Sequence, residues 1–594
     1  MATSPSSELD ARTFRRALAL AFAVGLSLRV LFAPLQGFPG DTVQFLRWMR
    51  ATVDWGITSL YDPARALDCN YPPTLPYVLR VIGEVDARLP WLRLYPKLET
   101  MLVKLPMIGF DLAVVALLAW WLQRRVGRAP ALWAAIALLA NPALIHLSGF
   151  WGQSDPAGFL PVLGGFFAIL SGVYPLAGVL LGIAFWTKFQ SVVFYPLAAL
   201  MLWRKGGAFA LGRAAIAGVL ASVAWLSPFI VAGNPHFFRM IDSAYGQNIG
   251  RYPDLSMGAA NRWALHPDPT TQDFHAPMFF YGPDGTVNAR GLLAQLTWRR
   301  MGLAMFLLAL AGVLAWFWRG RETSRWTAAA ILSVLAFFVF PTEMHERYLY
   351  PALPLVALVA AERVQLRRPF WILSSLYWLG LACTAPPAGA YRYLAPVMLT
   401  GLAGLAFLLA RQDDLEARLA QTSRLRLIAL IALILLLPAA LFAFWKAPAR
   451  HVRVYLDELP FTVVRQEWRP PVRNASIEHR PLQLGRMIYR RGIGVHAHSE
   501  LAVIAPARAQ RFVADVGLDA EIAGDPRADV RFRVLSGDEV LYESPILTAT
   551  SEAQRLDVPV KAGQELRLVV DGLYSPNGDH ADWANARFML EESK

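Results

Sequence analysis

Apolar runs long enough to cross a bilayer recur through the first three quarters of this 594-residue chain. The sequence is 55% hydrophobic, with a mean hydropathy of +0.37. This pattern predicts a polytopic α-helical membrane protein with about thirteen transmembrane helices. The candidate spans are residues 14–34, 101–122, 131–150, 157–172, 175–188, 189–203, 209–232, 295–318, 325–341, 350–364, 369–385, 391–410 and 426–446.

The composition changes near residue 450 to that of a water-exposed domain. The segments VRFRVL, EVLYES and ELRLVVDG alternate in polarity or carry β-branched residues, and SGD and KAG separate them as turns. We therefore expect two domains, a helical membrane domain over 1–449 and an all-β sandwich over 450–594.

Basic residues in the short loops between spans predict the topology. Residues 451–594 carry a net charge of −3, and the preceding part carries +16. The positive-inside rule explains this excess, so nucleic acid is not an expected partner and membrane lipids are. The loops share one side if the run 175–203 crosses twice, with a break near Lys188. The N-terminus is then cytoplasmic, and the tail is periplasmic or extracellular, at the cell membrane.

The stretch 36–76 is too polar to span a bilayer. Gln44, Arg47, Arg50 and Asp54 fall on one side of a predicted helix, with the apolar residues Val43, Leu46, Met49 and Val53 on the other. This indicates a helix lying in the membrane interface. Asp41 follows the Pro39-Gly40 turn, so it is read either as the N-cap of this helix or as a general base at the membrane surface.

Three polar clusters are expected on the outer side, each beside an apolar span. They contribute carboxylates, cations and aromatic rings, namely Asp41, then Trp151, Gln153 and Asp155 in FWGQSDP, then His345, Glu346, Arg347 and Tyr348 in PTEMHERYLYP. A base to activate an acceptor hydroxyl, cations for a leaving phosphate and aromatic faces for a sugar are what transfer from a membrane-borne phosphate donor needs. The alternative is a polar helix end that is hydrogen-bonded among the helices.

Together with LYDPARALDCNYPP, NPALIHLSGFWGQSDP, TKFQ and MHERYLYP, the sequence around Asp41 resembles the GT-C glycosyltransferases. The nearest likeness is to prokaryotic proteins similar to the dolichyl-phosphate-glucose and dolichyl-phosphate-mannose transferases. The resemblance implies an inverting transfer of one hexose, mannose or glucose, from a polyprenyl-phosphate sugar to a glycan or lipid-linked acceptor.

The resemblance also implies roles for individual residues. Asp41 matches the catalytic base, and His345 and Arg347 match groups near the donor phosphate, with Lys188 in TKFQ as a further donor-binding residue. The residues Trp151, Gln153, Asp155, Glu346 and Tyr348 are expected to contact substrate. No cofactor is expected. A divalent metal stays open, because no spacing resembles a dedicated metal site.

The tail resembles the NPCBM module, a β-sandwich found on glycosidases, through GIGVH, LYES and DHADW. The resemblance implies glycan binding, for which His496, Asp582 and Trp583 are the candidates. A tryptophan can stack on a sugar, but it can also fill the sandwich core, and the core reading of Trp583 is the favoured one.

Two other functions fit parts of the pattern. A transporter or flippase of lipid-linked sugars would also have many spans and buried charges, although no internal repeat is visible. In a membrane-anchored glycan-binding protein only the tail would act. Within the helical part, Asp111 lies in an apolar run and needs a polar partner. The aromatic-rich loop 233–290 is expected to cover the active site.

Overall fold

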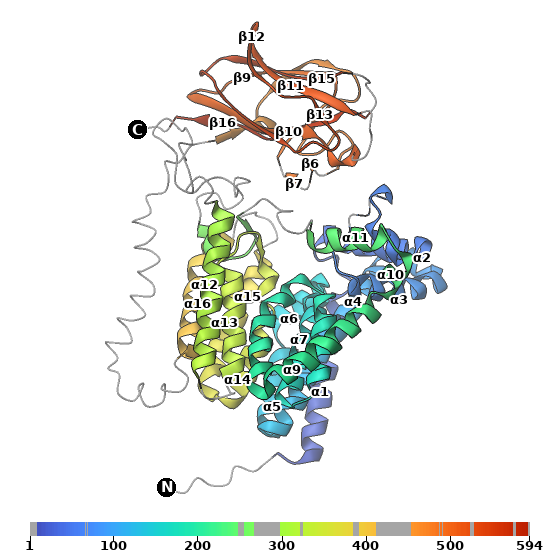
Figure 1. Cartoon of the computed structure of the whole chain (residues 1–594), viewed down its shortest axis with the longest axis vertical. Coiled ribbons are helices and arrows are strands. Elements are labelled where there is room, and N and C mark those ends of the chain that lie inside the picture. Colours follow the sequence, from blue (N-terminus) through green and yellow to red (C-terminus); the bar gives the residue numbers. More distant parts are fainter. Residues whose placement is uncertain are drawn as a thin grey trace, which may run out of the picture. The chain divides into compact units, whose positions relative to one another are not determined.

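The computed structural model consists of two compact units, one helical and one built of β-strands, and each is described separately (Figure 1). The residues that the structure describes are 9–65, 67, 69–246, 255–265, 297–320, 325–383, 391–410, 453–480, 482–485, 487–489, 491–522, 528–573 and 578–591. The predicted span 426–446 therefore lies outside the described residues, as does most of the second half of the loop 233–290.

Helices make up the first unit, with short 3-10 and π-helical turns between them. The α-helices are α1 Ala11–Phe32, α2 Pro39–Trp55, α3 Thr74–Arg88, α4 Pro96–Arg125, α5 Arg128–Leu139, α6 Pro142–Leu144, α7 Asp155–Leu170, α8 Tyr174–Phe185, α9 Tyr195–Trp225, α10 Ser227–Ala232, α11 His236–Ile241, α12 Trp298–Arg319, α13 Arg325–Val339, α14 Ala352–Glu362, α15 Arg367–Ala382 and α16 Tyr391–Ala410. The π-helical turns are Ile145–Trp151 and Asp242–Gly246.

The expected count of about thirteen spans is not reached. In the described residues, three helical stretches are long and apolar enough to cross a membrane: Pro96–Arg125, Phe189–Trp225 and Trp298–Arg319. A fourth results if the bent pair Arg128–Leu139 and Pro142–Trp151 is one span. The other apolar runs form shorter helices, such as α14, whose 11 residues are almost all buried. Apolar composition reports burial against protein as well as against lipid, which is why counting runs overestimated the spans.

The structure has the predicted break near Lys188. Helix α8 ends at Phe185, Lys188 is extended, and a 3-10 turn over Phe189–Phe194 leads into α9. A second break follows inside α9, where Gly206 and Gly207 leave helical geometry. Gly207 has a φ of 61°, a conformation that glycine adopts without strain. Both breaks separate segments that the sequence analysis took as different spans.

Helix α2 differs in detail from the expected interface helix. It starts three residues earlier, at Pro39, so Asp41 lies in its first turn and Phe38 is the N-cap residue. The N-cap interpretation of Asp41 is therefore wrong. Proline is favoured at the first helical position, because its missing N–H would be unpaired there anyway. The buried face also differs, since Phe45, Trp48 and Met49 are buried whereas Val43 is 55% exposed.

Part of the long loop 233–290 reaches the segment that carries His345. Strand β1, Ser256–Met257, pairs in parallel with strand β2, Met344–His345. The register places Ser256 beside Met344 and Met257 beside His345. A backbone ladder thus joins the described part of this loop to the HERY segment.

The second unit is the all-β sandwich predicted for the tail. One sheet has the order β14-β10-β16-β8-β5, with β3 on β16, and the other has β12-β11-β15-β9-β4, with β13 on β11. The strands are β3 Arg453–Tyr455, β4 Phe461–Gln466, β5 Val472–Arg473, β8 Gly492–His496, β9 Ser499–Ile504, β10 Ala509–Leu518, β11 Asp529–Ser536, β12 Glu539–Glu543, β13 Leu547–Thr548, β14 Gln554–Pro559, β15 Glu565–Gly572 and β16 His580–Leu590, and a separate hairpin joins β6 Leu482–Leu484 to β7 Met487–Tyr489. The three segments read as strands from their alternation are β11, β12 and β15.

Inward-facing residues of both sheets form one apolar core, which includes Phe512, Phe532, Trp583 and Phe588. The tail therefore has its own core, separate from that of the helices, as a domain requires.

Candidate functional site

The carboxylate of Asp41 is held by two side chains from a distant part of the chain. The indole Nε1 of Trp151 donates to Asp41 Oδ2 at 2.8 Å, and Nε2 of Gln153 donates to the same oxygen at 2.5 Å. In the described residues no donor contacts Oδ1. The first two polar clusters of the sequence analysis therefore meet, with one carboxylate oxygen fixed and the other available.

The local fold of residues 145–153 explains how Trp151 and Gln153 reach Asp41. Residues Ile145–Trp151 form a π-helical turn, which ends at Gly152 with a φ of 83°. A side chain at Gly152 would clash with Lys104, because an added Cβ would lie 2.5 Å from its Cγ. π-Helical turns are rare and occur frequently at functional sites.

The third cluster lies on the 3-10 turn Glu346–Leu349, directly after β2. Nη1 of Arg347 is 3.2 Å from Nδ1 of His345 and 3.5 Å from Oε1 of Glu346. Its guanidinium carbon lies 5.7 Å from the ring centre of Trp151 and 5.6 Å from that of Tyr348. Trp151 thus contacts Asp41 through its N–H and faces Arg347 with its ring.

Lys188 and Asp155 add a buried ion pair to this group. Asp155 opens α7, and its Oδ1 lies 2.8 Å from Nζ of Lys188. Both side chains are less than a tenth exposed. The lysine at the break after α8 therefore does not extend to the membrane interface but points inward to a carboxylate.

Burial changes the acid–base behaviour of Glu346 and Tyr71. Burial raises the pKa of Glu346 to about 7, although Arg347 acts in the opposite direction. The charges of Asp155 and Asp41 also raise this pKa. Burial likewise raises the pKa of Tyr71 far above its usual range, and the charges of Arg347, Asp41 and Asp155 act on its hydroxyl. The three clusters therefore share one electrostatic environment.

Several polar atoms in this group are buried without a hydrogen-bond partner. Among the described residues, these atoms are Oε1 of Gln153, Oγ of Ser154, Oδ2 of Asp155, Nζ of Lys188, Oε1 of Glu346 and Nε of Arg347. An unpaired buried polar atom costs about 1–3 kcal/mol, so a folded protein rarely leaves several together. Ordered water or a polar ligand can pair with these atoms.

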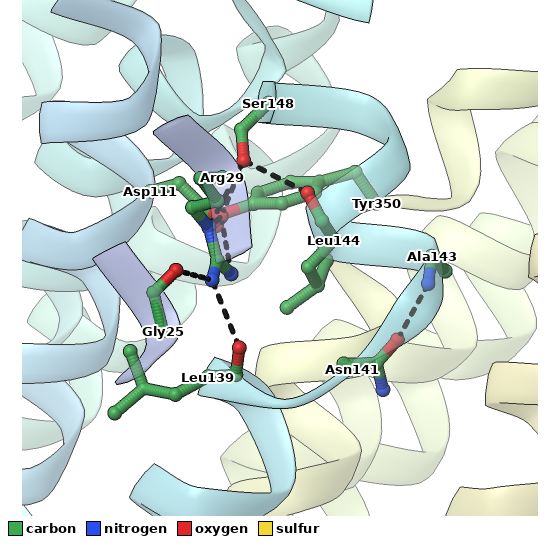
Figure 2. Close-up of polar contacts among 9 residues, drawn as sticks. All are labelled: Gly25, Arg29, Asp111, Leu139, Asn141, Ala143, Leu144, Ser148 and Tyr350. Atoms are coloured by element: carbon green, nitrogen blue, oxygen red, sulfur yellow. Dashed lines mark hydrogen bonds and ion pairs between the residues drawn. The ribbon is translucent and has the colours of Figure 1, made fainter. Parts of the chain in front are cut away.

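A second network of polar side chains is fully buried and is hydrogen-bonded to the π-helical turn. Arg29 forms an ion pair with Asp111 at 2.8 Å, and Ser148 in the turn donates to the same carboxylate at 2.9 Å (Figure 2). The hydroxyl of Tyr350 donates to its other oxygen at 3.0 Å. Asp111 thus has the polar partners that the sequence required, and it links α1, α4, the π-helical turn and the end of the HERYLYP segment.

Lys104 is a residue of this region that the sequence analysis missed. Its Nζ donates to the carbonyl of Phe150 at 2.5 Å and to that of Leu35, so it ties the chain before α2 to the π-helical turn. A lysine within an apolar run needs such partners, and the argument applied to Asp111 would have found it. Tyr71 was also missed, because tyrosine carries no signal that separates a site residue from a packed one.

The described residues contain no group of three or more His, Cys, Asp or Glu side chains placed to hold a metal ion.

In the tail, all three predicted glycan-binding residues are buried, two of them completely. Trp583 is completely buried and packs edge-on against Phe532, which is the core alternative given above. Asp582 is also completely buried, and burial together with the neighbouring carboxylate of Asp519 raises its pKa. Strand β16, which carries both residues, lies within its sheet between β10 and β8.

His496 is 6% exposed, and it lies in a cluster of three aromatic rings. Trp468, which is 38% exposed, stacks on His580 with 5.5 Å between ring centres and approaches His496 edge-on at 5.2 Å. The guanidinium of Arg469 lies 4.3 Å from the centre of the Trp468 ring. Trp468, rather than Trp583, is the tryptophan of the tail that reaches the surface.

Comparison with protein families agrees with this architecture. Residues 452–589 match the NPCBM/NEW2 domain. This match covers nearly all of the tail, so the tail is a domain of the NPCBM/NEW2 type.

Curated proteins match the chain over short stretches. Alpha-1,3-galactosidase B of Akkermansia muciniphila is 32% identical over 143 residues, which are 23% of this chain and 18% of that protein. The curated relatives that the chain matches are covered over 7% and 18% of their lengths. Among solved structures, CBM51 from Clostridium perfringens GH95 in complex with methyl-galactose is 28% identical, with a TM-score of 0.22, over 23% of this chain and 100% of that one.

Proposed function

We propose that the helical unit is a membrane glycosyltransferase that moves a hexose from a polyprenyl-phosphate donor to a hydroxyl acceptor at the outer face of the cell membrane. The observation that carries this proposal is the arrangement around Trp151, which contacts the Asp41 carboxylate on one side and faces Arg347 on the other. A donor sugar beside this indole would lie between a base and a cation. The resemblance of the sequence motifs to the GT-C glycosyltransferases supports the same reaction.

The proposed step is a single displacement at the anomeric carbon of the donor sugar. The acceptor oxygen forms a bond to this carbon while Oδ1 of Asp41 takes the hydroxyl proton. The bond from the anomeric carbon to the phosphate oxygen breaks, and the phosphate leaves with the electron pair. Attack from the side opposite the phosphate inverts the anomeric configuration.

Arg347 and Lys188 provide the positive charge that the leaving phosphate needs, and His345 can donate a hydrogen bond to it. The guanidinium of Arg347 is buried and its Nε is without a hydrogen-bond partner, so it can bind a phosphate oxygen with little loss of solvation. Lys188 is held by Asp155 and can turn from this carboxylate to an incoming anion. Gln153, Glu346 and Tyr348 are proposed to contact the substrate.

The tail is proposed to bind the glycan acceptor or a neighbouring surface glycan. Its match to the NPCBM/NEW2 domain supports this, and the exposed Trp468 offers an aromatic surface for a sugar.

The test of the catalytic proposal is Asp41→Asn. Asparagine keeps the size of the side chain and an oxygen that can accept from Trp151 and Gln153, but it cannot take a proton from the acceptor. We expect normal donor binding and a turnover lowered by about 10²–10⁴-fold, the usual worth of a general base. The measurement is hexose transfer from a synthetic polyprenyl-phosphate donor by the full chain in detergent.

Asp54→Asn is the matched control, because Asp54 is an exposed aspartate at the other end of α2. It should leave transfer unchanged. Near-normal turnover of the Asp41 variant would remove this residue from the mechanism. Absence of transfer by the unmodified protein with both mannosyl and glucosyl donors would overturn the proposed reaction itself.

A further inference from the structure

The buried part of the site has an unfavourable charge balance for an anionic ligand. Three carboxylates, Asp41, Asp155 and Glu346, face two cations, Lys188 and Arg347. If all five are ionised, their net charge is −1. A phosphodiester donor adds another negative charge in a region of low polarity, where like charges repel strongly.

Glu346 is the carboxylate best placed to relieve this repulsion. It is 3% exposed, and its Oε1 lies 3.5 Å from Nη1 of Arg347 without a hydrogen-bond donor. By contrast, Asp41 accepts two hydrogen bonds and Asp155 has its ion pair with Lys188. Among the described residues, the cation within 4 Å of the Glu346 carboxylate is Arg347, the same group that is proposed to bind the donor phosphate.

Resting on the proposed function, we propose that Glu346 binds the donor as a neutral carboxylic acid and donates its proton to a phosphate oxygen beside Arg347. The phosphate then replaces Glu346 as the anion next to the guanidinium. No bond of the donor changes in this step, since the proton stays shared between the carboxyl group and the phosphate. Glu346 is thus a binding residue that couples donor affinity to pH.

The charged and titratable groups that face Glu346 are consistent with a carboxyl group that gains and loses its proton near neutral pH. They come from four elements: Arg347 on its own turn, Asp155 in α7, Asp41 in α2 and Tyr377 in α15, on whose hydroxyl the charge of Glu346 acts. In the free protein the pKa of Glu346 is about 7. The acid form binds better, so affinity is highest below this value and falls as pH rises through it.

The experiment measures equilibrium binding to the full chain in detergent between pH 6 and 8. The probe is a short-chain prenyl phosphohexose, whose phosphodiester keeps one negative charge across this range. With a pKa of about 7, the acid fraction falls about tenfold between pH 6 and 8, so the dissociation constant of the unmodified protein should rise about tenfold. A second probe, methyl phosphohexose, lacks the lipid and should show the same pH dependence at lower affinity if the headgroup is what Glu346 recognises.

Glu346→Gln is the decisive variant, because its amide can still donate to a phosphate oxygen but does not titrate. We expect it to bind the probe at pH 8 about as well as the unmodified protein binds at pH 6, with a flat pH profile. Glu346→Ala, which cannot donate, should bind weakly at every pH. Loss of a proton from His345 or Lys188 at higher pH would also weaken anion binding. Both residues remain in the Gln variant, so any pH dependence of the dissociation constant that they cause is still measured there.

Two results would overturn the inference: a flat profile for the unmodified protein, or a Gln variant that keeps the tenfold slope. The infrared difference spectrum on donor addition provides a check that needs no variant. The C=O stretch of a protonated carboxyl group should gain intensity at pH 8, and no gain would also overturn the inference. These binding measurements do not depend on transfer, so the proposed reaction and the role of Glu346 can fail separately.

Discussion

Replacing Asp111 by Asn should destabilise the helical unit strongly, because it breaks an ion pair that is completely covered by protein. Both side chains are 0% exposed, and the guanidinium of Arg29 also donates to the carbonyls of Gly25 and Leu139 at 3.0 and 2.9 Å (Figure 2). These bonds keep Arg29 in place when its counter-ion is lost. The variant therefore leaves a buried positive charge without compensation.

The expected cost follows from this geometry. Removing one partner of a buried ion pair costs about 3–5 kcal/mol, of which the larger part is the penalty on the charge left behind. The introduced asparagine would keep an oxygen that can accept from Tyr350 or Ser148, so the loss should lie at the lower end, about 3 kcal/mol. The assay is unfolding of the full chain in mixed micelles by increasing denaturing detergent, followed by the fluorescence of its tryptophans.

The double variant Arg29→Met with Asp111→Leu separates charge from packing. It replaces the pair by apolar side chains of similar length, and it should be more stable than Asp111→Asn alone, because no charge remains buried. A cost below about 1 kcal/mol for Asp111→Asn would refute the reasoning. So would a double variant whose loss of stability equals the sum of the losses for Arg29→Met and Asp111→Leu made singly.

Three further predictions concern the site, the tail and the topology. Arg347→Lys should lose most transfer activity although the charge is kept, because lysine cannot make two parallel hydrogen bonds to a phosphate, and equal activity would exclude this role. In the tail, Trp468→Ala should abolish binding on a glycan array while leaving the melting temperature of the sandwich nearly unchanged, whereas Trp583→Ala should lower its stability by about 3–5 kcal/mol. A reporter fused after Lys594 should be active only outside the cytoplasm, and activity of a cytoplasmic reporter there would place the proposed site on the other side.

The sequence was sufficient to bring the polar clusters together but not to describe their contacts. Asp41, Trp151 and Arg347 were grouped because each adjoins an apolar span. In the structure, the indole of Trp151 donates to Asp41, and its ring faces the guanidinium of Arg347. The role of Asp41 in α2 was misjudged, because Pro39 was read as part of a turn before the helix, whereas it begins the helix. Hydrogen bonds across more than a hundred residues, such as that from Gln153 to Asp41, have no local signal at all.

Burial was the property that the sequence predicted least well. Alternation correctly identified the strands β11, β12 and β15. Asp582, a candidate for glycan binding, is buried in the sandwich, because β16 is flanked by β10 and β8, whereas Trp583 takes the core position that the sequence favoured. The predicted number of spans was too high for a related reason, since α7 and α14 are apolar on all sides because they belong to a packed interior. Periodicity identifies an element and its type, whereas which neighbours cover it depends on the whole fold.

The π-helical turn Ile145–Trp151 makes the length of this segment more important than the identity of most of its residues. A π-helix holds one residue more in a turn than an α-helix does, so deleting a single residue there would restore α-helical geometry. Every residue after the deletion would then rotate by about 100° around the helix axis, which is the advance per residue of an α-helix. Trp151 and Gln153 would turn away from Asp41 together, although no polar side chain had been lost. Related chains can therefore be expected to exchange apolar residues freely in this turn, while single-residue insertions and deletions within it are eliminated by selection.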